Sequence, residues 1–139
     1  MSEQEISVLI HEFDYLLKSE INRRIGHLNL AAEQTRILLL LGQHEEMCQN
    51  EIAEKLEKDK ANVTRMISSL ESKGFVTRYK DADNWKRKLV RLTILGEAAT
   101  ADIQKISVKL NADLSKGIEQ EELALFYNVI HRLRANIGR

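Results

Sequence analysis

The sequence predicts a mainly helical protein that carries one small β-hairpin. Three observations predict this class. Apolar residues recur every three or four positions in successive segments, as helices with one buried face require. The period changes to two over residues 75–80 and again over 88–93, which is typical of strands. The chain has 139 residues, of which 43% are hydrophobic and 30% charged, so one ordinary globular domain is expected.

The first half of the chain predicts three helices. The first covers residues 5–26 and the second covers 32–45, whose middle is apolar on nearly all sides and should therefore be buried. The third is the short segment "CQNEIAEKLEK", residues 48–58. Cys48 is expected at its N-cap, with Glu51 at the N3 position of a capping box.

A fourth helix is predicted from "KANVTRMISSLESKGF", with the helix over residues 60–73. Gly74 follows its last turn, where a left-handed C-cap favours glycine. On a helical wheel its apolar residues all fall within about 60 degrees of Val63 and should form the buried stripe. They are Val63, Met66, Ile67 and Leu70.

Two more helices follow the predicted hairpin. A long one begins after Gly96 and runs to about Lys116, where Gly117 ends it, and the last covers 119–137. The polar segment "DADNW" forms the turn of the hairpin. A helix pair joined by a tight turn and followed by a hairpin is a winged helix-turn-helix in outline.

The outward face of the fourth helix predicts binding to double-stranded DNA. A solvated face would carry mixed glutamate and lysine, whereas this one is small, polar and hydrogen-bonding. Arginine can pair with guanine, asparagine with adenine, and serine or threonine with base edges or phosphates. Small residues allow a helix to lie deep in the major groove. Of the residues expected to contact DNA here, Asn62, Thr64, Arg65 and Ser68 should read bases and Lys60 and Ser69 should hold phosphates, with Ala61 on the same face.

Charge is concentrated in the same part of the chain. The net charge is zero, yet residues 58–91 hold ten lysines and arginines against four acids, so this stretch carries +6 and the rest −6. An anion-binding surface and a merely solvated charged face both fit this pattern. A second reading is a winged-helix module that binds an acidic protein, for which Trp85 in the turn is the best support.

At these residues the chain resembles the MarR family of transcriptional regulators. The matching segments are "LAAEQTRILLLL", "QNEIAEKLEKDKANVTRMISSLESKGFV" and "RKLVRLTILGEAA". The resemblance covers nearly the whole chain and implies a single domain over 1–139. Within it, residues 30–96 would be the DNA-binding winged helix-turn-helix, and helices in 1–29 and 97–139 would form a homodimer. The implied function is a repressor of transcription that binds a pseudo-palindromic operator and responds to a small ligand.

The resemblance also implies roles for the wing, the turn and a ligand site. Family members often carry Asp-x-Arg on the wing, where this chain has Asn84-Trp85-Lys86, so Arg87 is expected to replace the arginine. The usual Gly-Val of the helix-turn-helix turn is Glu57-Lys58 here. The residues expected to hold phosphates or the minor groove are Lys86, Arg87 and Lys88, and those expected to line a ligand cleft are His11, Tyr15, His27 and Arg36.

Other chemistry has little support in the sequence. His44 and Cys48 have metal-ligand spacing, but the helix break expected near Met47 separates them, so no metal and no cofactor is predicted. No catalytic motif is present, and the chain is not expected to be an enzyme. Cys48 at a helix N-cap is kept as an alternative redox switch. The sequence lacks a secretory signal or a membrane-length apolar run, which predicts a cytoplasmic protein with no membrane partner.

Overall fold

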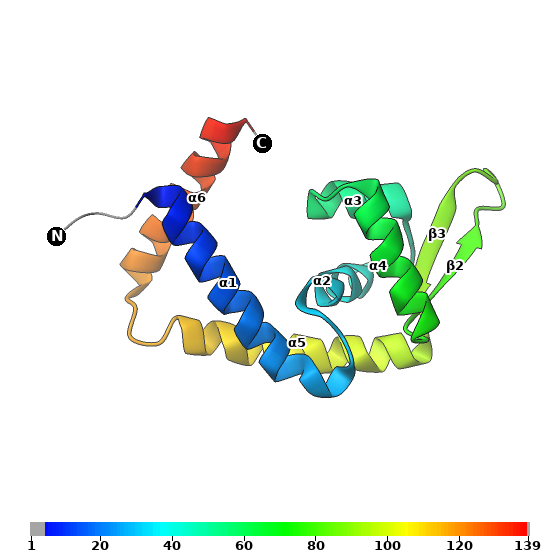
Figure 1. The fold of residues 1–139 in the computed structure, drawn as a ribbon, viewed down its shortest axis with the longest axis horizontal. Helices are drawn as coiled ribbons and strands as arrows, with labels where there is room; N and C mark the ends of the chain where they lie inside the picture. Colours follow the sequence, from blue (N-terminus) through cyan, green and yellow to red (C-terminus); the bar gives the residue numbers. More distant parts are fainter. Residues whose placement is uncertain (1–4, 139) are drawn as a thin grey trace. The chain divides into compact units, whose positions relative to one another are not determined.

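The computed structural model describes residues 5–138, which form two compact units that divide after Ile106. The second unit holds the end of α5 and all of α6 (Figure 1). This order confirms the predicted fold class, mainly α with a small β-hairpin. The elements are α1 (Ile6–Ile25), the 3-10 turn η1 (Gly26–Leu28), α2 (Ala32–Leu41), β1 (Met47–Cys48), α3 (Gln49–Leu56), α4 (Lys60–Ser72), β2 (Val76–Lys80), β3 (Lys88–Leu92), α5 (Ile94–Leu114) and α6 (Gln120–Ile137).

The core of the first unit lies between α2, α3, α4 and the sheet. The apolar middle of α2 is buried as predicted, and Ile37 and Leu38 are completely inaccessible. The predicted stripe of α4 is confirmed for Val63, Ile67 and Leu70, while Met66 is half-buried at the edge. Burial of each such side chain contributes roughly 1.5–3 kcal/mol, so α4 is held in one rotational setting. Within residues 5–138, no helix combines the length and apolar character that a membrane span requires.

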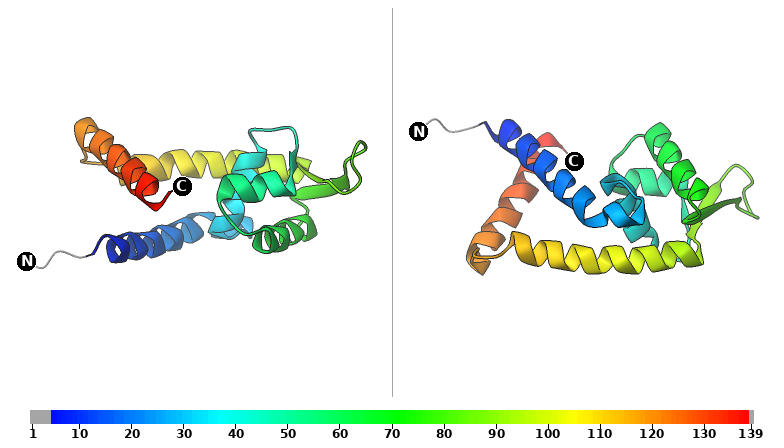
Figure 2. Two further views of the ribbon diagram at one scale, coloured as in Figure 1. Left: turned by 90° about the horizontal axis from the view of Figure 1, so that it is seen from above. Right: turned by 60° about the horizontal axis from the view of Figure 1, so that its bottom comes forward.

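The sheet has three antiparallel strands in the order β1-β3-β2. β2 and β3 form the predicted hairpin, with Val76 opposite Leu92 and Lys80 opposite Lys88. β1 was not predicted, because two residues are too few to produce an alternating pattern. It pairs Met47 with Val90 and thereby joins the start of α3 to the wing. The loop between β2 and β3 stands clear of the helices of this unit in every view (Figure 2).

Two helix boundaries differ clearly from the sequence prediction. α2 ends at Leu41, because the chain leaves the helix at Gly42. α5 begins before Gly96, not after it, because the Thr93 hydroxyl accepts a hydrogen bond from the Gly96 N–H at 3.0 Å and caps the helix. Gly96 is required there for another reason: a Cβ would lie 2.0 Å from the Phe75 carbonyl oxygen.

The predicted capping box of α3 is wrong. Cys48 does occupy the N-cap, but its side chain makes no capping hydrogen bond. Glu51 instead forms an ion pair with Arg87 of the wing loop. A cation 36 residues away competes successfully for this carboxylate, since a charged partner gives a stronger hydrogen bond than the neutral N–H of the N-cap residue.

Two residues with positive φ shape the helix-turn-helix region. Gly74 has φ +86°, which confirms the predicted left-handed C-cap after α4. Glu57 has φ +54° and takes the left-handed position at the end of α3, where glycine would be unstrained. The turn therefore keeps a glycine-type geometry without a glycine.

Glu71 fastens α4 to the wing. Its Oε2 accepts a hydrogen bond from the Arg78 backbone N–H at 2.9 Å, and its Oε1 accepts one from Arg78 Nη2 at 3.0 Å. These bonds lower the pKa of Glu71, with the backbone N–H as the largest cause and the guanidinium next. The one acid of α4 thus has a structural partner on β2.

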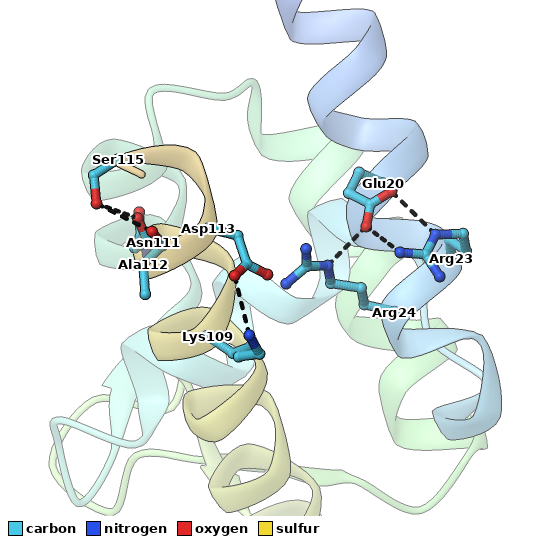
Figure 3. Close-up of polar contacts among 8 residues, drawn as sticks. All are labelled: Glu20, Arg23, Arg24, Lys109, Asn111, Ala112, Asp113 and Ser115. Atoms are coloured by element: carbon cyan, nitrogen blue, oxygen red, sulfur yellow. Dashed lines mark hydrogen bonds and ion pairs between the residues drawn. The ribbon is translucent and has the colours of Figure 1, made fainter. Parts of the chain in front are cut away.

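Glu20 plays a similar local part on α1. It accepts hydrogen bonds from Arg23 Nε at 3.0 Å and from Arg24 Nε at 2.8 Å (Figure 3). Together these two arginines, Arg23 first, lower the pKa of Glu20 to about 2. The carboxylate therefore stays ionised and ties together the last turns of the helix.

In the second unit, an ion pair and a hydrogen bond join neighbouring turns near the end of α5. On α5, Lys109 Nζ lies 3.0 Å from Asp113 Oδ1, one turn apart (Figure 3). The Ser115 hydroxyl donates to the Asn111 carbonyl at 3.0 Å and satisfies the end of α5 (Figure 3). Gly117, with φ +78°, then turns the chain toward α6, as predicted.

We expect Glu57→Gly to raise the free energy of unfolding by about 0.5–1 kcal/mol, because glycine adopts positive φ without the penalty of a Cβ. An exposed glutamate contributes too little through its own contacts to cancel this gain. Urea unfolding at fixed protein concentration measures the change. Glu54→Gly is the matched control, since it places glycine inside α3 and should cost about 1 kcal/mol. Equal losses in both variants would contradict the strain at Glu57.

We expect Glu71→Gln to lower the free energy of unfolding by about 1 kcal/mol at pH 7, a value that allows for solvent screening of a half-exposed pair. The pKa of Glu71 is lowered from 4.5 in the folded state. Its contribution is therefore present above pH 4.5 and is lost as the pH falls through the folded pKa. Unfolding curves of both proteins from pH 7 to pH 3 should converge at the acid end, and a difference that stays constant would refute the assignment.

Candidate nucleic-acid interface

The exposed face of α4 is presented by the way the helix begins and by what it buries. Asp59 is the N-cap, and its Oδ1 accepts a hydrogen bond from the Asn62 N–H at 2.7 Å. Burial of Val63, Ile67 and Leu70 then turns the opposite face outward. The residues predicted for base contacts lie on this face, exposed or half-exposed: Ala61, Asn62, Thr64, Arg65 and Ser68.

Hydrogen bonds within this face hold its longer side chains in place. Arg65 Nη2 donates to Asn62 Oδ1 at 3.0 Å. The Thr64 hydroxyl donates to the Lys60 carbonyl at 2.8 Å and accepts from Gln49 Nε2 at 3.3 Å. The bond to Asn62 holds the guanidinium of Arg65 in place, and its other N–H groups remain available as donors. They suit a planar, bidentate acceptor such as a guanine edge.

The flank of α4 that faces α2 serves the fold. Ser69, predicted to hold a phosphate, accepts a hydrogen bond from the buried Gln34 Nε2 at 3.0 Å. Lys73 Nζ donates to the Asn29 carbonyl at 2.8 Å and to Gln34 Oε1 at 3.2 Å. Sequence reasoning missed Gln34, although a glutamine within an apolar helix such as α2 was a usable signal of a buried polar partner.

The three basic wing residues lie in different surroundings. Lys88 is exposed on β3 opposite Lys80. Lys86 Nζ lies 5.5 Å from the centre of the Trp85 ring. Arg87 points back toward α3 instead.

Arg87 lies between two carboxylates. It forms an ion pair with Glu51 of α3, and its Nη1 lies 3.4 Å from Asp81 Oδ2 at the base of the wing loop. The pKa of Arg87 is raised, first by the neighbouring Cys48 side chain and then by Glu51. Arg87, which was expected to replace the arginine of the family's wing motif, is therefore braced by Asp81 and by Glu51 of α3.

The residues predicted to line a ligand cleft lie on the surface of the protein. His11, Tyr15, His27 and Arg36 are all exposed. An open pocket of about 780 Å³ lies between α1, the start of α2 and α4, and none of the four is in its lining. Its lining includes Lys18, Asn22, Glu33, Gln34, Met66 and Lys73.

Metal and redox chemistry gain no support from the geometry. Within residues 5–138, no group of three histidine, cysteine or acidic side chains could hold a metal ion. Gly42 ends α2 before His44, so His44 and Cys48 do not share a helix. Cys48 is buried with 6% exposure beside Arg87, and a redox role for it stays an untested alternative.

Comparison with known proteins identifies relatives across most of the chain. The model of the MarR family matches residues 30–88. The uncharacterized HTH-type transcriptional regulator YdgJ of Bacillus subtilis (strain 168) is 31% identical over 109 residues, which are 78% of this chain and 66% of YdgJ. The chain spans about half, 51%, of the length of a further Bacillus cereus relative.

Solved structures show the same fold. The transcriptional regulator SlyA, 26% identical, superposes with a TM-score of 0.89 over 96% of this chain and 94% of that one. The Staphylococcus aureus MepR–DNA complex, 22% identical, superposes with a TM-score of 0.94 over 98% of this chain and 100% of that one. With the family match, these comparisons establish that the chain belongs to the MarR family and has its winged helix-turn-helix fold.

Proposed function

We propose that this protein is a sequence-specific, DNA-binding transcriptional regulator that acts as a homodimer on a pseudo-palindromic operator. The observation that carries the proposal is the outward face of α4, which is small, hydrogen-bonding and supported from within. Helix-turn-helix proteins insert such a helix into the major groove. MepR, which shares the fold, was solved in complex with DNA.

Within this proposal each exposed residue has a distinct role. Arg65 reads guanine, while Asn62, Thr64 and Ser68 contact neighbouring base edges and Ala61 permits close approach. Lys60 at the start of α4, with Lys86 and Lys88 on the wing, neutralises phosphates. Ser69 and Arg87 are left out of the direct contacts because each already has partners inside the protein.

Exposed apolar side chains support the homodimer. On α1, Leu9, Phe13 and Leu16 are 52–63% exposed, although they follow the spacing of a buried stripe. On α6, Phe126 and Val129 are 55% and 49% exposed. Apolar faces of this extent on a monomer mark interaction sites, and a second copy of the chain is the proposed cover.

Three finer points belong to the same proposal. The regulator acts as a repressor in the cytoplasm. Its activity is the binding and release of DNA, and it catalyses no reaction. A small-molecule effector alters that binding, with the open pocket beside α4 or the neighbourhood of His11, Tyr15, His27 and Arg36 as its candidate sites.

One observation favours a second candidate function. Trp85 at the wing tip is 69% exposed, and aromatic side chains are enriched where proteins bind proteins. A winged-helix module that binds an acidic protein would use it. The polar face of α4 has no role in that alternative, so DNA binding is the function proposed here.

Fluorescence anisotropy tests the proposed function. A labelled duplex from the region upstream of the gene, a scrambled duplex and a duplex selected from a random-sequence pool are titrated at two salt concentrations. Preference of about 10³-fold or more for one sequence, with affinity that falls as salt rises, is the expected result. Equal affinity for all duplexes, or no binding at low salt, would overturn the proposal.

We expect Arg65→Ala to weaken specific binding by about 1–3 kcal/mol and to relax preference at one base pair, because a bidentate guanine contact is lost. The measurement is anisotropy with the selected duplex and its single-base variants. Arg23→Ala, which removes an exposed arginine from α1, is the matched control for net charge. Equal losses for both variants would show that Arg65 contributes charge alone.

A further inference from the structure

The tip of the wing is a fixed turn that presents two side chains. The Arg87 N–H donates to the Asn84 carbonyl at 2.8 Å, which closes a β-turn with Trp85 and Lys86 at its centre. Asn84 Oδ1 also accepts from the Lys86 N–H at 3.2 Å. Below the turn, the Asp81 N–H donates to the Arg87 carbonyl at 2.9 Å. The tip is therefore ordered by its own backbone.

The charged groups around the tip disfavour Arg87 as the residue through which the wing contacts a ligand. Arg87 follows the turn, but its guanidinium is engaged by Glu51 and Asp81. Asp83 is exposed on the same loop and opposes the charge of Lys86. Electrostatic attraction alone is thus weak at this point, and the largest exposed contact surface is the indole of Trp85, 69% exposed with Lys86 5.5 Å from its ring.

From these observations we propose that the wing contacts DNA through Trp85 and Lys86, with the indole in the minor groove, and that Arg87 is a positioning residue that holds the wing against α3. This rests on the proposed function. With α4 in the major groove, a hairpin of five-residue strands extends about 17 Å, enough to cross one backbone strand. Apolar wedges and N–H donors both suit the minor groove, whose floor carries acceptors, and Lys86 is placed to meet the adjacent phosphate.

Trp85 is the only tryptophan of the chain, so its emission reports the tip directly. The test measures acrylamide quenching of the protein alone and saturated with the selected duplex, while anisotropy of the labelled duplex follows complex formation in the same sample. The quenching constant should fall by about half or more in the complex. If the complex forms and the quenching constant does not change, this inference is wrong and the proposed function stands. If no duplex binds, both fail.

Variants test the contributions of the Trp85 indole, the Lys86 ammonium group and the Arg87 brace to DNA affinity separately. Trp85→Ala should weaken binding about tenfold without changing the salt dependence, because the apolar contact of the indole with the minor groove is lost, and Trp85→Phe should retain most of the affinity. Lys86→Ala should reduce the salt slope by about one. Replacement of guanine by inosine, which removes the minor-groove amino group only, should change the affinity of the wild type and not of Trp85→Ala. Wild-type affinity retained in Trp85→Ala would overturn the proposal and leave a protein partner for the indole.

Glu51→Gln distinguishes a bracing Arg87 from one that contacts DNA. If Arg87 contacted DNA, loss of Glu51 would free it and raise affinity beyond the general effect of removing an acid. Glu54→Gln, an exposed acid on the same helix, measures that general effect. If Arg87 is a brace, Glu51→Gln should bind more weakly than Glu54→Gln, and Arg87→Ala should cost nothing further in a variant that already lacks both contacts, Trp85→Ala combined with Lys86→Ala. A Glu51→Gln variant that binds more tightly than Glu54→Gln would overturn the assignment.

Discussion

Burial of one face of α4 is the constraint on which the rest of the structure depends. Val63, Ile67 and Leu70 lie in the common core with α2, α3 and the sheet. A rotation of α4 by one residue, about 100 degrees, would expose these side chains and bury Asn62 or Thr64. Because protein interiors are closely packed and unpaired polar groups are costly inside them, the core selects the direction in which the polar face points. A packing requirement thereby sets the geometry of the candidate interface.

Polar contacts between α4, the neighbouring elements and the wing then fix this orientation of the helix. Gln34 holds the flank of α4 from α2, and Glu71 holds its far end against β2 through Arg78. Gln49 joins the start of α3 to Thr64, while Arg87 joins the wing loop to α3. Two of these contacts, Gln34 with Ser69 and Glu51 with Arg87, join residues 35 and 36 positions apart. The face of α4 and the wing tip are thus parts of one braced unit.

Sequence periodicity was sufficient to predict the elements that bury apolar surface. It was insufficient to predict the features that depend on pairing with a distant strand or side chain. The α4 stripe and the hairpin follow from spacing alone, and Gly74 was placed correctly because its chemistry matches a left-handed cap. β1 is too short for any period to appear. Glu51 was assigned to a capping box on local spacing, yet its partner is Arg87, and no local pattern identifies a partner 36 residues away. Residues whose roles depend on long-range charge pairing therefore required the structure.

Spatial pairing also changes the meaning of the charge pattern. The stretch 58–91 carries +6 in the sequence. Three acids from outside the stretch, Glu33, Glu46 and Glu51, form ion pairs with cations inside it, so the stretch and these acids together carry +3. Because non-specific affinity for DNA scales with the number of phosphates neutralised, this pairing reduces attraction to arbitrary sequence. A larger share of any affinity then depends on hydrogen bonds and fit at α4 and the wing tip, which are the contacts able to distinguish one sequence from another.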